Sequence, residues 1–523
     1  MKIEADPDNC CIQLFRSLRS DVQRISEKMM KLSNEARRGV ILALASVSAA
    51  FATIRPVASM DPDIWWRIRT GEWILANHAL PKTEVFAWPV AGRPFTEYSW
   101  MFDVLSEWLF RHGGMLMVSG FSLAMAVGIG VALFAVLRNR CHNGIVAAVV
   151  AALSMIAMAK IMTPRPWLFT ILFFIAEIWL LTSGARPGRL RRLFWLAPLF
   201  FLWANIHVQF VYGFVPLGLF AVEYAIQTAR RKDAGRGKDL MVAMAAMGAA
   251  FASTFLTPFG LGLYKTVFEY AGQSSAFRNI SELRPPSFRT WDDYLLVVAV
   301  AVAGIVVGRA MRHIEPFMIG LCAVGAIAAF RSERDVWVLI IPAALVVCTS
   351  SLEPLILRRK SYAVAALLAV VAVVPVCANR MSTRQMEATL SQHFPVEACD
   401  FLSRTSMGGL ADRVYTPFDW GGYVMWRLPQ SRVSMDGRTN IHGDERVARH
   451  VQTGNGGAGW ESDPDLSGAG VILVMNQMPL ASLLREDNGY RLIHHDGVAS
   501  VFIHSGLVHV SNAKPGDAHR VGL

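Results

Sequence analysis

Eleven apolar runs of bilayer length dominate the sequence and confine it to a membrane-spanning fold. They lie near residues 39–56, 115–137, 144–160, 167–182, 193–206, 208–228, 240–256, 294–308, 314–330, 336–350 and 362–379. A helix needs about 20 apolar residues to cross the hydrocarbon core of a bilayer. Charged residues make up 17% of the chain, whereas soluble domains contain about 25%. We therefore expect an α-helical polytopic membrane protein with about 11 transmembrane helices.

The Lys and Arg residues between these runs indicate how the chain crosses the membrane. They cluster in alternate connections, at 138–140, 186–192, 230–238, 309–312 and 358–360. Short loops rich in Lys and Arg stay in the cytoplasm, so the N-terminus is expected inside and the C-terminal region outside. Because the net charge of +11 is concentrated in such loops, no nucleic-acid partner is expected.

The segments on either side of the helical region have a different composition. Residues 1–38 are predicted to be a cytoplasmic amphipathic segment, and 39–379 a transmembrane domain. Residues 380–510 alternate strand-like runs with helical signals, which predicts a small α/β domain outside the membrane, and 511–523 are expected to be a disordered tail. The strand-like runs are 414–415, 432–435, 471–474, 490–493 and 501–504, and the helical signals are 396–404 and 478–486.

The long first outer loop, residues 57–114, opens with Asp61 and Asp63, followed by two Trp and two Arg residues. A carboxylate placed here can act as a general base or bind Mg²⁺ or Mn²⁺ through oxygen. Alternatively, Asp61 followed by Pro62 marks a helix start that the Asp caps, and both roles can hold together. The paired Trp side chains suit the membrane interface, and residues 100–109 have the spacing of a helix lying along the outer membrane surface.

Five arginines at the outer ends of spans depart from the expectation that basic residues stay inside. They are Arg67, Arg69, Arg165, Arg331 and Arg334. A phosphate or pyrophosphate head group is a natural partner, because Arg offers two parallel donors. The alternative is pairing with Glu97, Glu333, Asp335 or phospholipid.

Single polar residues in other outer connections are further candidates. Glu282, in the loop from 257 to 293, could complete a metal site with Asp61, or could be a solvated surface charge. His207 could carry a proton or bind a ligand, or could be a hydrogen-bonded turn residue. Tyr264 is a weaker candidate. The seven cysteines show no spacing typical of metal ligands.

Three motifs, in order along the chain, resemble those of a known superfamily. They are Asp61-Pro-Asp-Ile-Trp-Trp-Arg-Ile-Arg69, Ile280-Ser-Glu282, and Phe418-Asp-Trp-Gly-Gly-Tyr423 followed by Asp436-Gly-Arg-Thr439. This order resembles the GT-C superfamily of polyprenyl-phosphate-dependent glycosyltransferases, and it is most similar to distant relatives of the oligosaccharyltransferase catalytic subunit. The resemblance extends from about residue 40 to about residue 505. Much of the chain also looks like bacterial members of the superfamily.

The resemblance implies an inverting sugar transfer at the periplasmic face of a bacterial inner membrane, from a donor linked to undecaprenyl phosphate or pyrophosphate. Asp61 would be the catalytic base or a metal ligand, with Asp63 beside it, and Glu282 its partner for the metal or the acceptor. Asp419, Trp420 and Tyr423 would shape the acceptor side, where Glu97, His207 and Tyr264 are further candidates.

One departure from the family pattern concerns the metal. Residues 162–167 lack the Asp-x-Asp of oligosaccharyltransferases and contain Arg165 instead. Dependence on Mg²⁺ or Mn²⁺ is therefore in doubt, and a metal-independent enzyme that uses Arg to hold the leaving phosphate is the alternative. The same departure leaves open a non-catalytic glycan- or lipid-binding subunit of an envelope polysaccharide assembly. A transporter would need internal repeats, which the sequence does not show.

Overall fold

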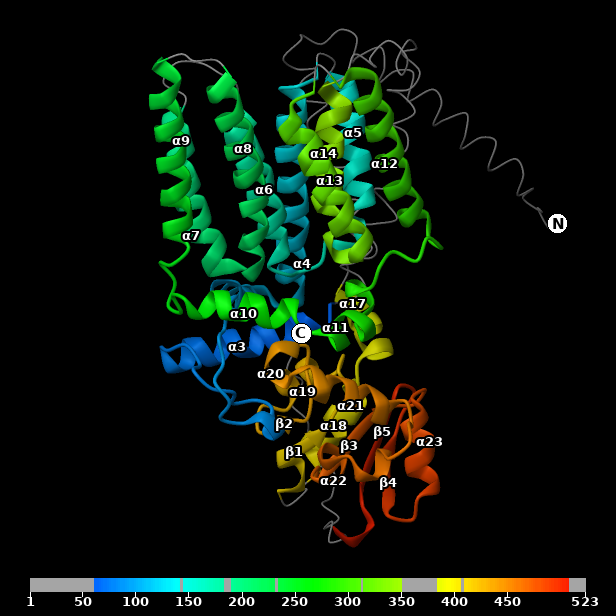
Figure 1. Ribbon diagram of the computed structural model, residues 1–523. Helices are drawn as coiled ribbons and strands as arrows, with labels where there is room; N and C mark the ends of the chain where they lie inside the picture. Colours follow the sequence, from blue (N-terminus) through cyan, green and yellow to red (C-terminus); the bar gives the residue numbers. More distant parts are fainter. Residues whose placement is uncertain are drawn as a thin grey trace, which may run out of the picture.

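The computed structural model describes residues 61–141, 144–182, 190–230, 234–311, 314–349, 383–405 and 409–507. A bundle of long helices stands on a small α/β unit, and α3 (Asp63–Asn77), α10 (Gly262–Ala271) and α11 (Ser274–Asn279) lie between the two (Figure 1). The predicted spans 39–56 and 362–379, the amphipathic segment within 1–38 and the tail 511–523 lie outside the described residues.

The bundle helices coincide with the predicted apolar runs to within a few residues at most of their ends. They are α4 (Trp100–Arg138), α5 (Gly144–Ala157), α6 (Trp167–Thr182), α7 (Leu196–Ile206), α8 (Phe214–Arg230), α9 (Ala234–Ser253), α12 (Trp291–Ala310), α13 (Pro316–Arg331) and α14 (Trp337–Thr349). Helix α4 is broken at Gly113 and Gly114, and Gly114 has φ +59°, a conformation that favours glycine. The break separates the predicted surface segment near 100–109 from the span that follows it.

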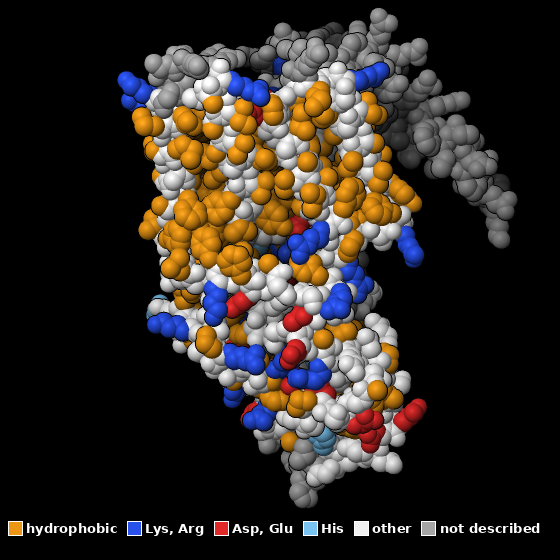
Figure 2. Space-filling model, in the orientation of Figure 1, with side chains coloured by type: hydrophobic (Ala, Val, Ile, Leu, Met, Phe, Trp, Pro, Cys, Tyr) orange, Lys and Arg blue, Asp and Glu red, His pale blue; other side chains and the backbone are white. Residues whose placement is uncertain are grey.

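Three helices in the described residues are long and apolar enough to cross a membrane: Trp100–Arg138, Val208–Arg230 and Asp293–Ala310. Shorter apolar helices cover Val146–Ala157, Trp167–Thr182 and Pro316–Arg331. Figure 2 shows hydrophobic side chains over most of the bundle, with charged side chains gathered at its upper end and over the lower half of the molecule. The chain is thus mostly helical with membrane-type helices, and the full number of eleven spans stays a prediction.

The α/β unit contains a five-stranded sheet in the order β2-β1-β3-β5-β4. Its strands are β1 (Arg413–Tyr415), β2 (Arg432–Val433), β3 (Val471–Met475), β4 (Tyr490–His495) and β5 (Ala499–His504). Strand β1 pairs in parallel with β2 and β3, whereas β5 is antiparallel to β3 and β4. The helices are α17 (Thr383–His393), α18 (Val396–Arg404), α19 (Gly421–Arg427), α20 (Thr439–His442), α21 (Asp444–Gly454), α22 (Pro464–Ser467) and α23 (Pro479–Glu486). All five predicted strand-like runs and both predicted helices are present.

The first outer loop and the α/β unit share one hydrophobic core. Trp65 is fully buried, and its ring lies 5.1 Å from that of Tyr423 and 4.5 Å from that of Trp426. Trp66 is also buried, at 2% exposure. The expectation that this Trp pair lies at the membrane interface is therefore wrong, because the α/β unit supplies a dry aromatic surface that removes far more of each indole from water.

The contact between the two parts needs glycine on the α/β side. A Cβ on Gly437 would come within 2.2 Å of Asp63 Oδ1, and one on Gly422 within 3.1 Å of the Pro62 carbonyl oxygen. These glycines let α19 and the segment after β2 press directly against the start of α3. At the β2 edge of the sheet, Val433 N donates to the Phe86 carbonyl oxygen at 3.0 Å, so the first outer loop extends the sheet on that side.

Candidate functional site

Three carboxylates from distant parts of the chain converge on the guanidinium of Arg165. Its Nε donates to Asp61 Oδ2, and its Nη1 lies 3.0 Å from Asp63 Oδ2 and 2.8 Å from Glu282 Oε1. Asp61 precedes α3, Arg165 precedes α6, and Glu282 lies in a short 3-10 turn, Ser281–Leu283. The structure therefore brings together all three residues predicted to be catalytic, with one predicted phosphate ligand at their centre.

The start of α3 fixes the position of Asp61. Its Oδ1 accepts a hydrogen bond of 2.9 Å from the Asp63 backbone N, as a capping carboxylate does, and this leaves Oδ2 for Arg165. Asp61 thus bonds to the start of the helix and also lies beside other charged groups, so the two roles considered for it are compatible. A free backbone N–H at a helix N-terminus also favours negative charge there.

A tight turn and an indole ring fix Arg165. Its backbone N donates to the Thr163 carbonyl oxygen at 2.7 Å, and prolines stand on both sides of it. Its guanidinium lies 4.6 Å from the ring centroid of Trp167, a cation–π contact that restrains its orientation. The side chain is 10% exposed, so it meets the carboxylates mostly out of water.

Two connections hold the Glu282 turn in place. On the bundle side, Glu333 N donates to the Arg284 carbonyl oxygen at 2.9 Å, which brings Arg334 Nη1 to 3.9 Å from Glu282 Oε1. On the α/β side, Asp444 accepts from the Ser275 backbone N at 2.6 Å, and Gln273 Nε2 donates to the Thr439 carbonyl oxygen at 2.9 Å.

The charges in this group perturb each other. Burial raises the pKa of Asp63 to about 6, with smaller contributions from the negative charges of Asp61 and Glu282, while Arg165 opposes the increase. Burial alone would lower the pKa of Arg165, but the surrounding carboxylates outweigh it and hold the pKa well above its ordinary value. The guanidinium therefore stays charged, and the carboxylates share a single strong counter-ion.

The other predicted arginines fall into two groups. Arg334 is part-buried beside Glu282, and its Nε has no hydrogen-bond partner in the described structure. Arg331 is exposed and stacks on Phe277 at 4.6 Å. Arg67 instead pairs with Asp103 at 2.9 Å, next to the buried Glu97.

Arg69 pairs with Glu72 at 2.6 Å and donates to the Pro429 carbonyl oxygen at 3.2 Å. It contacts none of the three carboxylates that converge on Arg165. Of the five arginines predicted to bind phosphate, Arg165 and Arg334 thus lie beside Glu282, and Arg331 stacks on Phe277 of the same outer connection. Arg67 pairs instead with Asp103 of α4, and Arg69 with Glu72 of α3.

The remaining candidates divide between the site and the core. Asp419 is exposed and close enough to Arg165, Glu282 and Asp61 to interact with their charges. Trp420 is buried, and its Nε1 donates to the His393 carbonyl oxygen at 2.8 Å. Tyr423 packs on Trp65 inside the shared core.

His207 and Tyr264 are held by hydrogen bonds within the helical part. His207 Nδ1 lies 2.9 Å from Thr170 Oγ1 in a buried turn, which matches the alternative weighed for it. The Tyr264 hydroxyl lies 2.5 Å from Thr254 Oγ1, with the ring stacked on Phe255 at 5.2 Å.

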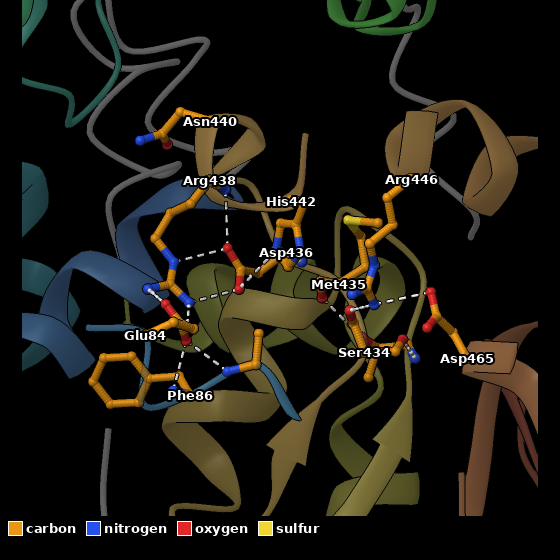
Figure 3. Close-up of polar contacts among 12 residues, drawn as sticks. Glu84, Phe86, Ser434, Met435, Asp436, Arg438, Asn440, His442, Arg446 and Asp465 are labelled. Carbon is orange, nitrogen blue, oxygen red and sulfur yellow. Dashed lines mark hydrogen bonds and ion pairs between the residues drawn. The ribbon is translucent and has the colours of Figure 1, made fainter. Parts of the chain in front are cut away.

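A second arginine-centred group was not predicted from the sequence (Figure 3). Arg438 donates to both oxygens of Glu84, at 2.8 and 3.0 Å, and to Asp436 Oδ2 at 2.7 Å. Burial alone would raise the pKa of Asp436, but Arg438 and His442 outweigh it and hold the pKa below its ordinary range. We call Glu84, Asp436 and Arg438 the clamp, because they join the first outer loop to the α/β unit. Asp436 and Arg438 were visible as part of a motif, whereas nothing in the sequence singled out Glu84.

The first group does not fit a divalent cation as it stands. In the part of the chain that the structure describes, no group of three or more His, Cys, Asp or Glu residues is arranged to hold a metal ion. The inward oxygens of Asp61, Asp63 and Glu282 are all directed to Arg165. A metal that met these three oxygens would have to displace the guanidinium.

Comparisons with known proteins support the fold. No protein-family model matches the sequence, and no curated protein sequence matches it. Among solved structures, the oligosaccharyltransferase AglB from Archaeoglobus fulgidus, in complex with an inhibitory peptide and a dolichol-phosphate, is similar with a TM-score of 0.56 and 12% identity, over 84% of this chain and 69% of that chain. The Archaeoglobus fulgidus oligosaccharyltransferase in its apo form gives a TM-score of 0.54 with the same identity and coverage. This confirms the resemblance at the level of the fold: the chain is distantly similar in structure to archaeal oligosaccharyltransferases.

Proposed function

We propose that the protein is a polyprenyl-phosphate-dependent glycosyltransferase that transfers a sugar, with inversion, to an envelope glycan, lipid or protein. The observation that carries this proposal is the meeting of Asp61 and Glu282 with Arg165 and Arg334 at one end of a GT-C-type helix bundle. Glycosyl transfer from a lipid phosphate needs a base for the acceptor and positive charge for the leaving group. This site offers both in one place.

The proposed reaction has one displacement step. Asp61 accepts the proton of an acceptor hydroxyl as its oxygen attacks the anomeric carbon of the donor sugar. The bond from that carbon to the phosphate oxygen breaks, and the polyprenyl phosphate or pyrophosphate leaves with the electron pair. Arg331 and Arg334 stabilise the departing phosphate, and the guanidinium of Arg334, whose side chain is 27% exposed, supplies donors for it. Asp419 and Glu282 face the acceptor.

The proposed setting is the periplasmic face of a bacterial inner membrane, with the N-terminus in the cytoplasm and the α/β unit outside. Arg138, Arg230 and Arg309 end their helices opposite the site, as expected for a cytoplasmic bundle end. The donor is then an undecaprenyl-linked sugar, and envelope-assembly subunits are candidate partners.

The test compares three versions of the protein in the source strain after deletion of the native copy. Mass spectrometry of envelope glycans and lipids should show a lost sugar and an accumulated lipid-linked precursor in the deletion strain. Wild-type protein should restore the sugar, and Asp61→Asn should reduce its transfer by about 10²–10⁴-fold, the usual contribution of a general base.

The matched control is Glu269→Gln, which removes a carboxylate from the outer connection that carries Glu282. Glu269 is 43% exposed and pairs only loosely with Lys265 at 3.9 Å, so transfer should stay at the wild-type level. Full transfer by Asp61→Asn protein present at normal abundance would contradict the proposal. Donor binding without turnover by the wild type would instead support the non-catalytic binding subunit.

A further inference from the structure

The convergence of three carboxylates on Arg165 raises the question of which cation this centre uses. Carboxylates that meet at one point repel each other unless a positive charge lies among them. Asp63 Oδ2 and Glu282 Oε1 both approach the same nitrogen, Nη1 of Arg165, at 3.0 and 2.8 Å. Asp61 Oδ2 accepts from Nε of the same side chain.

We infer that the guanidinium of Arg165 takes the place of a divalent metal among Asp61, Asp63 and Glu282, so that the centre works without Mg²⁺ or Mn²⁺. The inference deepens the proposed transfer reaction and rests on it for its catalytic meaning. Arg165 is then a positioning residue, which orients the base Asp61 and supplies fixed positive charge beside the leaving phosphate.

Geometry excludes a metal at this point while Arg165 stays. Mg²⁺ binds oxygen at about 2.0–2.1 Å in a nearly ideal octahedron. The oxygens that such an ion would need already surround Arg165 nitrogens at hydrogen-bond distance. The other oxygen of Asp61 is also used, because Oδ1 accepts from the Asp63 backbone N at 2.9 Å. An entering dication would lie next to a permanently charged guanidinium and would be repelled by it.

The surroundings of Arg165 prevent it from moving aside easily. The side chain is only 10% exposed, and its guanidinium stacks on Trp167 at 4.6 Å. Arg334 Nη1 lies 3.9 Å from the same oxygen, Glu282 Oε1, and adds a second positive charge to that carboxylate. A dication would therefore have to displace one arginine and approach another.

The experiment measures Mn²⁺ binding to the purified full-length protein in detergent by electron paramagnetic resonance. Wild type should show no saturable Mn²⁺ binding at the centre, whereas Arg165→Ala should bind one ion per protein, since three oxygen ligands then face each other without a guanidinium. Adding Asp61→Asn to Arg165→Ala should abolish that binding.

Two variants control for charge and place. Arg165→Lys keeps a cation at the centre and should bind Mn²⁺ no better than wild type. Arg334→Ala removes the neighbouring arginine, which contacts Glu282 at 3.9 Å but neither Asp61 nor Asp63 directly, and should also leave the centre closed to Mn²⁺. If Arg165→Ala binds Mn²⁺ and neither control variant does, the exclusion of the metal is assigned to Arg165.

One ion bound by the wild type and lost in Asp61→Asn would overturn the inference, and so would equal Mn²⁺ binding by Arg165→Ala and wild type. If Arg165→Ala does not fold, the wild-type and Asp61→Asn titrations decide alone. The resonance signal requires no turnover, so a failed transfer assay and a failed metal prediction remain separate results.

Discussion

Arg438 and Arg165 each lie among carboxylates, and their surroundings differ. Arg438 in the clamp is 1% exposed and its partners Glu84 and Asp436 are fully buried. Arg165 is 10% exposed, with Asp63 at 17% and Glu282 at 30%. The clamp is sealed inside the protein, whereas the Arg165 group has an edge open to solvent.

The two groups also differ in how each arginine is shared among its carboxylates. Arg438 forms a bidentate pair with Glu84 and a second contact with Asp436, so its donors are saturated by rigid acceptors. Arg165 is shared by three carboxylates from separate segments. A buried arginine with all its donors bonded, such as Arg438, is suited to joining two parts of a protein. A partly exposed arginine shared by three carboxylates, such as Arg165, is suited to meeting a substrate.

The largest effect should come from opening the clamp. Arg438→Met leaves the carboxylates of Glu84 and Asp436 buried without a counter-ion and should destabilise the protein by about 3–5 kcal/mol. Thermal unfolding in detergent measures this. Arg404→Met is the matched control, because the Arg404 side chain is 67% exposed and its pair with Asp400 should contribute about 0.5 kcal/mol or less. Equal shifts for the two variants would remove the distinction between the groups.

Glu282→Gln and Glu84→Gln should separate activity from stability. Removing Glu282 leaves Arg165 held by two carboxylates and should lower transfer by about 10–100-fold, with less than about 1 kcal/mol lost in stability because the residue is partly exposed. Glu84→Gln should lower the stability and leave the transfer rate per folded protein nearly unchanged. In the described residues the Glu84 carboxylate bonds to Arg438 and to backbone amides, away from the Arg165 group. Transfer assays normalised to folded protein, together with melting curves, check both halves.

Acidic pH should lower the stability of the α/β unit through His450. Burial lowers the pKa of His450, in α21, to about 3. Below about pH 6.5 the unfolded chain binds a proton that the folded chain refuses, so stability should fall by about 1.4 kcal/mol per pH unit down to the folded pKa. His450→Asn should flatten the dependence of stability on pH between pH 7.5 and 5.5, whereas His393→Asn, at an exposed position, should leave it unchanged. Parallel slopes in both variants would exclude His450 as the cause.

The smallest effect concerns the tie between the Glu282 loop and the α/β unit. Asp444→Ala removes the acceptor of the Ser275 backbone N, at 2.6 Å, and of Ser274 Oγ, at 3.0 Å. Losing this cap should cost about 1 kcal/mol locally, or about fivefold faster hydrogen exchange in peptides covering 272–284. Glu445→Ala, at the exposed neighbouring position, should leave that exchange unchanged.

Local patterns in the sequence predicted the elements well and their association poorly. Apolar run length predicted the bundle helices, and short β-branched runs predicted strands such as β3 and β5. Strand β2 ends at Val433, short of the predicted 432–435: beyond it, the Ser434 hydroxyl and the Met435 carbonyl oxygen accept hydrogen bonds from Thr416. The wrong placement of Trp65 and Trp66 has a similar origin, since their burial depends on a partner surface more than 300 residues away.

The composition of the site was predicted, but its internal contacts were not. Arg165 was selected because basic residues are unexpected at the outer ends of spans, and Asp61 and Glu282 as carboxylates that could form a base or metal site. The structure brings all three together. Arg165 was expected to hold a phosphate, and the structure shows it bound by carboxylates, a distinction that depends on distances no sequence contains. Glu84 gave no signal, because its partner Arg438 comes from a segment that no local pattern connects to it.

The glycines that face α3 have a consequence for how the protein is made. Gly422 and Gly437 touch the turn that carries Asp61 and Asp63, yet they emerge from the ribosome more than 350 residues later. Until then Trp65, Trp66 and Glu84 lack the α/β surface that buries them in the folded protein. The chain therefore completes its reactive centre only near the end of synthesis, and an interrupted chain carries the acids without the surface that organises them.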